Sequence, residues 1–185
     1  MAVPRLEDEH TAVLIVDMQE RLLPVIAEQE QLTRQAGKLL DGAHALELPV
    51  LATEQYPKGL GATLPALAER MGRVRCKPEK VKFSSCIEPV REELARLGAR
   101  AVVVAGIEAH VCVLQTCLDL LEAGYAAAVA VDAVGSRQAV DRDAAIQRMV
   151  QAGVVPTTVE SFLLEVVREA GGARFKAVLP LMKES

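Results

Sequence analysis

Short runs of apolar residues alternate along the chain with longer segments in which apolar residues recur every three or four positions. A run that is apolar at nearly every position predicts a strand buried on both faces, as in a parallel sheet. Six segments have or approach this pattern: residues 11–16, 49–53, 73–76, 100–105, 126–131 and 153–157. The alternation predicts an α/β fold, a three-layer α/β/α sandwich around a mostly parallel, Rossmann-like sheet.

The segments between these runs have the spacing of amphipathic helices. Four segments have this spacing, and residues that commonly begin or end helices support the last three of them. These are residues 32–46, the segment from Pro89 to Gly98, the segment from Val113 to Gly124, and the segment from the capping-box pattern Thr157-x-x-Glu160 to Gly171-Gly172. Residues 56–65 form the one long stretch typical of a loop. We expect these elements to make one domain over residues 1–185.

The composition is that of a soluble domain with a compact core. Apolar residues are 51% of the 185 and aromatic residues only 3%, so alanine, valine and leucine must build the core. The 21 basic and 25 acidic residues give a net charge of −4, which argues against a nucleic-acid or anionic-membrane surface. No stretch resembles a membrane span, and the acidic residues 1–10 do not resemble a presequence, so we expect a cytoplasmic protein.

Residues that follow the apolar runs are the candidates for chemistry, because parallel α/β sheets bind ligands beyond the carboxyl ends of their strands. Asp17 directly follows the first run, where a carboxylate is either a helix N-cap or a functional group. Cys112 lies in or just before the first turn of a predicted helix. We expect the helix dipole there to lower the pKa of its thiol. The alternative is a buried, inert thiol.

The other cysteines and two nearby lysines give weaker signals. Cys117 lies among leucines in mid-helix, which indicates an inert thiol, and Cys76 and Cys86 favour neither interpretation. None of the four cysteines belongs to a C-x-x-C pair, so we expect neither a disulfide scaffold nor a zinc knuckle. Lysines in such a mixed segment, here Lys80 and Lys82, are usually solvated. A lysine that turned inward near a cysteine and an aspartate would instead stabilise a thiolate.

Three of these segments together resemble the signatures of the isochorismatase-like cysteine hydrolase superfamily, to which nicotinamidases and N-carbamoylsarcosine amidases belong. They are residues 16–19 (VDMQ), Lys80-x-x-Phe83-Ser84 and residues 106–113 (GIEAHVCV). Any one of them alone would be weak, but the three in this order are specific. The branch called isochorismatase domain-containing proteins is further resembled by residues 53–63, residues 132–153 and Phe175-Lys176, so the likeness covers nearly the whole chain.

The resemblance implies a catalytic triad in which Asp17 takes the proton of Cys112 and Lys80 stabilises the thiolate and keeps Asp17 ionised. The thiolate would attack a small amide or a related C–N compound, and water would hydrolyse the resulting thioester. The resemblance also implies a cis peptide bond between Ile107 and Glu108, which would turn the N–H groups of Glu108 and Cys112 toward the oxyanion.

Within the triad we prefer Lys80 to Lys82, because the family motif has its lysine three residues before the aromatic residue. We expect His110 to be a pocket-wall or capping residue, since a neighbour two positions from Cys112 does not face it on a helix. The full set of candidate pocket residues is Gln19, Glu54, Gln55, Tyr56, Phe83 and His110.

Departures from the family pattern narrow the expected chemistry. Nicotinamidases have an Asp/His cluster after the second strand that binds a metal, whereas residues 52–56 here read ATEQY. His10, His44 and His110 are not clustered, so we expect neither a metal nor another cofactor, and nicotinamide becomes a less favoured substrate. The true isochorismatases of siderophore pathways lack the nucleophilic cysteine, so we do not expect a chain with Cys112 to cleave an enol ether.

The sequence leaves other functions open. The chain could hydrolyse another acyl substrate, such as a thioester or an ester, or be a regulatory or scaffold member of the fold with little turnover. A flavin- or nucleotide-binding module is disfavoured, because the turn after the first run has no glycine phosphate cradle. The expected partners are a small-molecule substrate and further copies of the chain in a homo-oligomer, with no nucleic acid and no membrane. Residues 175–182 could pack on such a copy or on their own domain.

Overall fold

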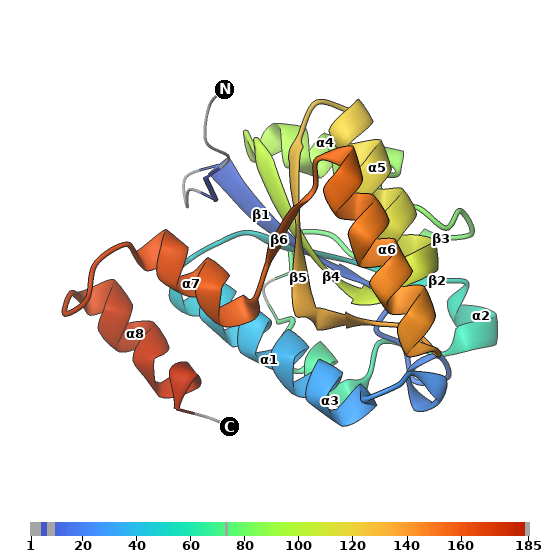
Figure 1. Cartoon of the computed structure of the whole chain (residues 1–185), viewed down its shortest axis with the longest axis horizontal. Helices are drawn as coiled ribbons and strands as arrows, with labels where there is room; N and C mark the ends of the chain where they lie inside the picture. Colours follow the sequence, from blue (N-terminus) through green and yellow to red (C-terminus); the bar gives the residue numbers. More distant parts are fainter. Residues whose placement is uncertain (1–4, 7–9, 73, 184–185) are drawn as a thin grey trace.

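The computed structural model describes residues 5–6, 10–72 and 74–183, and shows a parallel β-sheet between two layers of helices (Figure 1). The sheet has the strand order β3-β2-β1-β4-β5-β6, and every neighbouring pair is parallel. The strands are β1 (Thr11–Val16), β2 (Val50–Gln55), β3 (Glu79–Lys80), β4 (Ala101–Ile107), β5 (Ala126–Gly135) and β6 (Val155–Thr157). The predicted three-layer α/β sandwich is confirmed.

Two hydrophobic cores separate the sheet from its helices, one on each face. The first core contains residues of α1 (Gln29–Ala45), α7 (Val159–Val167) and α8 (Ala173–Met182). The second contains residues of α4 (Glu88–Arg96), α5 (Leu114–Glu122) and α6 (Ala139–Ala152). The shorter helices are η2 (Leu23–Val25), α2 (Pro57–Leu60), α3 (Pro65–Ala68) and the π-helix η3 (Ala109–Val113).

The continuous apolar runs of the sequence follow from this sandwich. In β1, Val13 and Ile15 belong to the core on one face, and Leu14 and Val16 belong to the core on the other. Because successive side chains of a strand point to opposite faces, a strand covered on both sides is apolar at nearly every position. Its buried residues thereby fix both layers of helices against one sheet.

The strand predicted at residues 73–76 is misplaced. The described part of this segment lies beside β2, with hydrogen bonds from the Arg75 N–H to the Val50 carbonyl and from the Ala52 N–H to the Cys76 carbonyl. The assigned strand, however, is Glu79–Lys80, and Arg73 itself lies outside the described residues. The pairing of β3 with the carboxyl end of β2 brings Lys80 to the edge of the sheet where Asp17 lies.

Several predicted element ends also differ from the structure. The N-cap of α7 is Thr158, whose hydroxyl accepts a hydrogen bond from the Ser161 N–H, so the predicted pairing of Thr157 with Glu160 is wrong. This helix ends at Val167 rather than at the glycine pair of residues 171–172. The loop predicted at residues 56–65 contains the short helix α2. These differences are local and leave the order of the elements unchanged.

The ends of the chain bear on two further expectations. Most of the acidic segment at residues 1–10 lies outside the described residues. The apolar segment near the carboxyl end forms α8, which packs on α1 and α7 of the same chain. In the part of the chain that the structure describes, no helix is long and apolar enough to span a membrane.

Candidate active site

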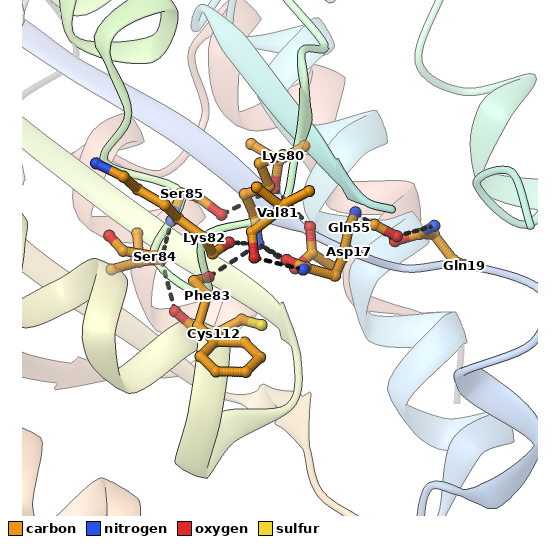
Figure 2. A network of polar contacts seen from close by, with 12 residues as sticks. Asp17, Gln19, Gln55, Lys80, Val81, Lys82, Phe83, Ser84, Ser85 and Cys112 are labelled. Atoms are coloured by element: carbon orange, nitrogen blue, oxygen red, sulfur yellow. Dashed lines mark hydrogen bonds and ion pairs between the residues drawn. The ribbon is translucent and has the colours of Figure 1, made fainter. Parts of the chain in front are cut away.

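Three separate segments bring polar groups to the carboxyl edge of the sheet, where the strand order reverses. Asp17 directly follows β1, and Cys112 lies in η3 after β4, the strand that pairs with β1. Lys80 ends β3 on the other side of β2. In doubly wound sheets the crevice at this reversal is the usual ligand site. The fold therefore brings together the three residues that the sequence analysis had singled out (Figure 2).

Asp17 and Lys80 form a buried ion pair. Lys80 Nζ lies 2.6 Å from Asp17 Oδ2, and the two side chains are 1% and 0% exposed. The ammonium also donates to Gln55 Oε1 at 2.7 Å and to the Phe83 carbonyl at 2.8 Å. Buried charges are tolerated only when they are paired and hydrogen-bonded, as here. Lys82, in contrast, is exposed.

The backbone at Asp17 aims its carboxylate into this crevice. Asp17 has a φ of 52°, in the left-handed region that aspartate tolerates better than most residues. Burial raises the pKa of the Asp17 carboxyl, while the charge of Lys80 and hydrogen bonds from Lys80, Thr53 and Cys112 partly offset that rise. A carboxylate whose pKa is raised is a stronger base and accepts a proton more readily than an ordinary aspartate.

The pKa of the Cys112 thiol is raised rather than lowered, which corrects the expectation from the helix start. Burial and the adjacent Asp17 charge raise the pKa to about 12, and Lys80 and a hydrogen bond from the Glu108 main chain oppose the rise. A free thiolate is therefore rare at neutral pH. The Cys112 thiol lies next to the Asp17 carboxylate, so transfer of its proton onto Asp17 forms a thiolate without adding a second buried negative charge.

Hydroxyl groups that were not predicted from the sequence lie around Asp17 and Cys112. Thr53 donates to Asp17 Oδ1 at 2.8 Å and lies 2.8 Å from Ser85 Oγ. Thr116 donates to the Cys112 carbonyl at 2.6 Å and accepts from the Ser85 N–H. One signal could have found Thr53: it ends the second apolar run, as Asp17 follows the first.

Comparison with known proteins supports the resemblance drawn from the motifs. The isochorismatase domain model matches residues 11–161. The chain belongs to the isochorismatase family. The mouse isochorismatase domain-containing protein 2A is 38% identical over 181 residues, which cover 97% of this chain and 86% of that protein.

Two solved structures place this isochorismatase-family chain among proteins of the same fold. MAR1 ribonuclease from Caenorhabditis elegans is 40% identical, with a TM-score of 0.94 over 98% of this chain and 94% of that one. YcaC from Pseudomonas aeruginosa, solved with hexane-2,5-diol and covalent acrylamide, is 27% identical, with a TM-score of 0.90 over 98% and 93% of the two chains. Both likenesses extend over nearly the whole isochorismatase-family fold.

Two glutamines clamp the Asp17 side of the isochorismatase-family site. Gln19 accepts from the Gln55 N–H at 2.7 Å and donates to the carbonyl oxygens of Gln55 and Gly61. The Gln55 amide in turn accepts from Lys80 and donates to the Val81 carbonyl at 3.0 Å. Gln19 is thus a structural clamp, whereas Gln55 contacts the candidate triad directly.

The other predicted pocket residues divide into two groups. Glu54 bonds to Thr63 and Lys77, and because it alternates with Thr53 and Gln55 along β2 it faces away from Asp17. Tyr56 and Phe83 are each 54% exposed, and their main chains hold Lys80: the Tyr56 N–H donates to the Lys80 carbonyl, and the Phe83 carbonyl accepts from Nζ. Only this second group stays at the rim of the site.

The Cys112 side of the site is fastened to the loop after β5. The peptide bond between Ile107 and Glu108 is cis. The Glu108 carboxylate accepts from the Arg137 side chain at 3.0 Å, and His110 Nδ1 lies 2.9 Å from Ser136 Oγ. His110 therefore has its partner in Ser136 rather than in the Cys112 thiol.

The donor set does not favour a metal in this isochorismatase-family site. Within the described residues, no group of three or more His, Cys, Asp and Glu side chains could hold a metal ion. Each oxygen of the Asp17 carboxylate already accepts a hydrogen bond, Oδ2 from Lys80 and Oδ1 from Thr53, and the Lys80 ammonium beside it would repel a cation. The arrangement supplies a base, a fixed positive charge and a thiol, which suits nucleophilic rather than Lewis-acid chemistry.

Proposed function

We propose that this protein is a cysteine hydrolase that cleaves a small amide or a related C–N bond through a thioester on Cys112. One observation carries the proposal: a buried Asp17–Lys80 ion pair lies next to a buried thiol at the carboxyl edge of the sheet. The isochorismatase family supports a hydrolase. The finer assignment to C–N bonds is taken from the resemblance.

In the proposed first half-reaction, Asp17 takes the proton from Cys112 Sγ as the sulfur attacks the carbonyl carbon. The carbonyl π electrons move to oxygen, and the main-chain N–H groups of Glu108 and Cys112 stabilise the oxyanion. When the oxyanion collapses, the C–N bond breaks and Asp17 gives its proton to the leaving nitrogen. The amine departs, and the acyl group stays on Cys112 as a thioester.

In the second half-reaction, Asp17 takes a proton from water as the water oxygen attacks the thioester carbonyl. Collapse of this intermediate breaks the C–S bond and releases the carboxylic acid, and the proton returns to the sulfur. Lys80 stays protonated throughout, so its charge offsets the negative charge that moves between Asp17 and Cys112. No metal or redox partner enters this sequence.

Ribonuclease activity is the second candidate, because the C. elegans protein that is 40% identical bears that name. The net charge of −4 offers little electrostatic attraction for RNA. The two candidates also differ in what they require of the thiol. Amide hydrolysis through a thioester needs Cys112, whereas cleavage of RNA by acid–base chemistry needs only groups such as Asp17 and Lys80.

The deciding experiment measures ammonia or amine release from a panel of small amides, with ester, thioester and fluorogenic RNA substrates as further arms. Cys112→Ala is the blank, and Cys117→Ala is the matched control, because Cys117 is a buried thiol in α5. We expect release from at least one amide that Cys112→Ala abolishes and Cys117→Ala leaves within about twofold. RNA cleavage that persists in Cys112→Ala, or turnover of the ester arms alone, would overturn the proposal.

A further inference from the structure

Two short hydrogen-bonded paths lead from Ser85 to the two reacting groups. On one path, the Ser85 hydroxyl lies 2.8 Å from Thr53 Oγ1, which donates to Asp17 Oδ1 at 2.8 Å. Since a hydroxyl has one proton and Thr53 gives its own to Asp17, the Ser85 hydroxyl must donate to Thr53. Lys80 occupies the other carboxylate oxygen, Oδ2.

The second path starts from the main chain of the same residue. The Ser85 N–H donates to Thr116 Oγ1 at 2.8 Å, and that hydroxyl donates to the Cys112 carbonyl at 2.6 Å. Thr116 lies in the first turn of α5, directly beyond the π-helix that carries Cys112. The orientation of this helical turn is therefore coupled to Ser85.

Both hydrogen-bonded paths are buried, so the loss of any bond in them would leave a polar group without a partner. The three residues Thr53, Ser85 and Thr116 are each at most 1% exposed, so water cannot replace a lost partner. Ser85 belongs to the segment between β3 and α4, in which the Phe83 carbonyl also accepts from Lys80. One segment thus contacts the lysine directly and reaches the base and the thiol through one threonine each.

We propose that Ser85 is a positioning residue that holds Asp17 and Cys112 in position to react with each other, through Thr53 on one side and Thr116 on the other. This inference rests on the proposed function, because the relative position of Asp17 and Cys112 matters only if Asp17 takes the thiol proton. It assigns different tasks to the two threonines. Thr53 keeps the carboxylate ionised and oriented, whereas Thr116 fixes the backbone that carries the sulfur.

The experiment follows alkylation of Cys112 by iodoacetamide as a function of pH, with the adduct located by mass spectrometry. The sulfur displaces iodide as Asp17 takes the thiol proton, so the rate rises as Asp17 becomes ionised. Within the described chain, the titratable groups that face Asp17 are Lys80 from β3 and Cys112 from η3. Because no substrate is needed, failure of the amide panel and failure of this inference are separate results.

Thr53→Val removes a donor to the carboxylate, so we expect the midpoint of the rate profile to move up by about one pH unit. Ser85→Ala should move it in the same direction by less. Thr116→Val should lower the rate about tenfold and leave the midpoint in place. Thr53→Ser keeps the hydroxyl and should restore the wild-type midpoint, which separates the hydrogen bond from packing.

Thr11→Val is the matched control. Its hydroxyl on β1 is buried and has no hydrogen-bond partner in the part of the chain that the structure describes, so its loss should leave midpoint and rate unchanged. Wild-type profiles for folded Thr53→Val and Ser85→Ala would overturn the inference. So would equal shifts for Thr53→Val and Thr53→Ser. If a valine variant does not fold, Ser85→Ala against wild type decides.

Discussion

At the scale of single residues, the site depends on how one carboxylate divides its hydrogen bonds. Oδ2 of Asp17 accepts from Lys80 and Oδ1 accepts from Thr53, while the thiol of Cys112 is a third neighbour. Burial raises the pKa values of both Asp17 and Cys112. The two groups consequently compete for one proton, and Lys80 supplies the charge that keeps the shared negative charge in place.

Lys80→Met should therefore lower the free energy of unfolding by more than the removal of both charges does. Alone, it leaves a buried carboxylate without its cation, and we expect the free energy of unfolding at pH 7 to fall by about 3–5 kcal/mol. The double variant Asp17→Asn/Lys80→Met removes both charges and should recover about half of that loss. Urea unfolding of the wild type, both single variants and the double variant completes a double-mutant cycle for the ion pair. A Lys80→Met loss below about 1 kcal/mol would contradict it.

The pH dependence of this cycle has a defined sign. The folded-state pKa of Asp17 lies above its unfolded value, so its contribution to stability is fully present below the unfolded pKa and is lost as pH rises through the folded pKa. Without Lys80 the folded pKa rises further. The extra instability of Lys80→Met should thus grow from acid toward neutral pH and disappear in the Asp17→Asn background.

At the scale of elements, the junction of β1 and β4 positions the site. Gly106 lies in β4 opposite Val16, with a φ of 122°, and a Cβ there would overlap the Val16 carbonyl. The next residue along β1 is Asp17. Close backbone approach at Gly106 therefore sets how far the base stands from the β4 end that leads to Cys112.

Gly106→Ala should destabilise the fold by about 3 kcal/mol and also lower turnover, because it combines backbone strain with overlap. The matched control is Gly124→Ala, which has a φ of 88° and nothing within 4 Å of the added Cβ. It should cost only about 1 kcal/mol and leave activity unchanged. Thermal unfolding and amide hydrolysis of both variants measure the difference, and equal effects would show that close approach is unimportant.

The elements themselves were largely predictable, and the failures have physical causes. Continuous apolar runs marked β1, β2, β4 and β5, because a strand covered on both faces is apolar at most of its positions. β3 has only Glu79 and Lys80 and lies at the edge of the sheet, so it has no such run. Its place follows from pairing with β2, which is a tertiary contact.

The candidate site was predictable only in part for the same reason. Asp17 and Cys112 follow apolar runs, and the family motif distinguished Lys80 from Lys82. The direction of the Cys112 pKa was wrong, because local helix geometry lowers a thiol pKa whereas burial beside a carboxylate raises it. Both causes of the rise depend on packing between distant segments. Thr53, Ser85 and Thr116 were missed because their side chains act through pairing across the fold.

At the scale of the whole molecule, we expect the two layers of helices to have separate tasks. The layer formed by α4, α5 and α6 belongs to the core that includes Cys112. The opposite layer contains α1, α7 and α8, and the terminal helix α8 packs on the other two rather than on the sheet edge of the site (Figure 1). Homo-oligomer formation and cytoplasmic location stay predictions.

Val178→Ala tests this division of tasks. Val178 is the buried residue of α8, and its truncation should lower the free energy of unfolding by about 2 kcal/mol through lost burial and a small cavity. Because the cavity lies in the core opposite Cys112, we expect kcat/KM of the folded protein to stay within about twofold. Val150→Ala in α6, where the valine is 45% exposed, is the control and should cost less than about 1 kcal/mol. A loss of activity in Val178→Ala well beyond the fraction unfolded would show that α8 and the site are coupled through the sheet.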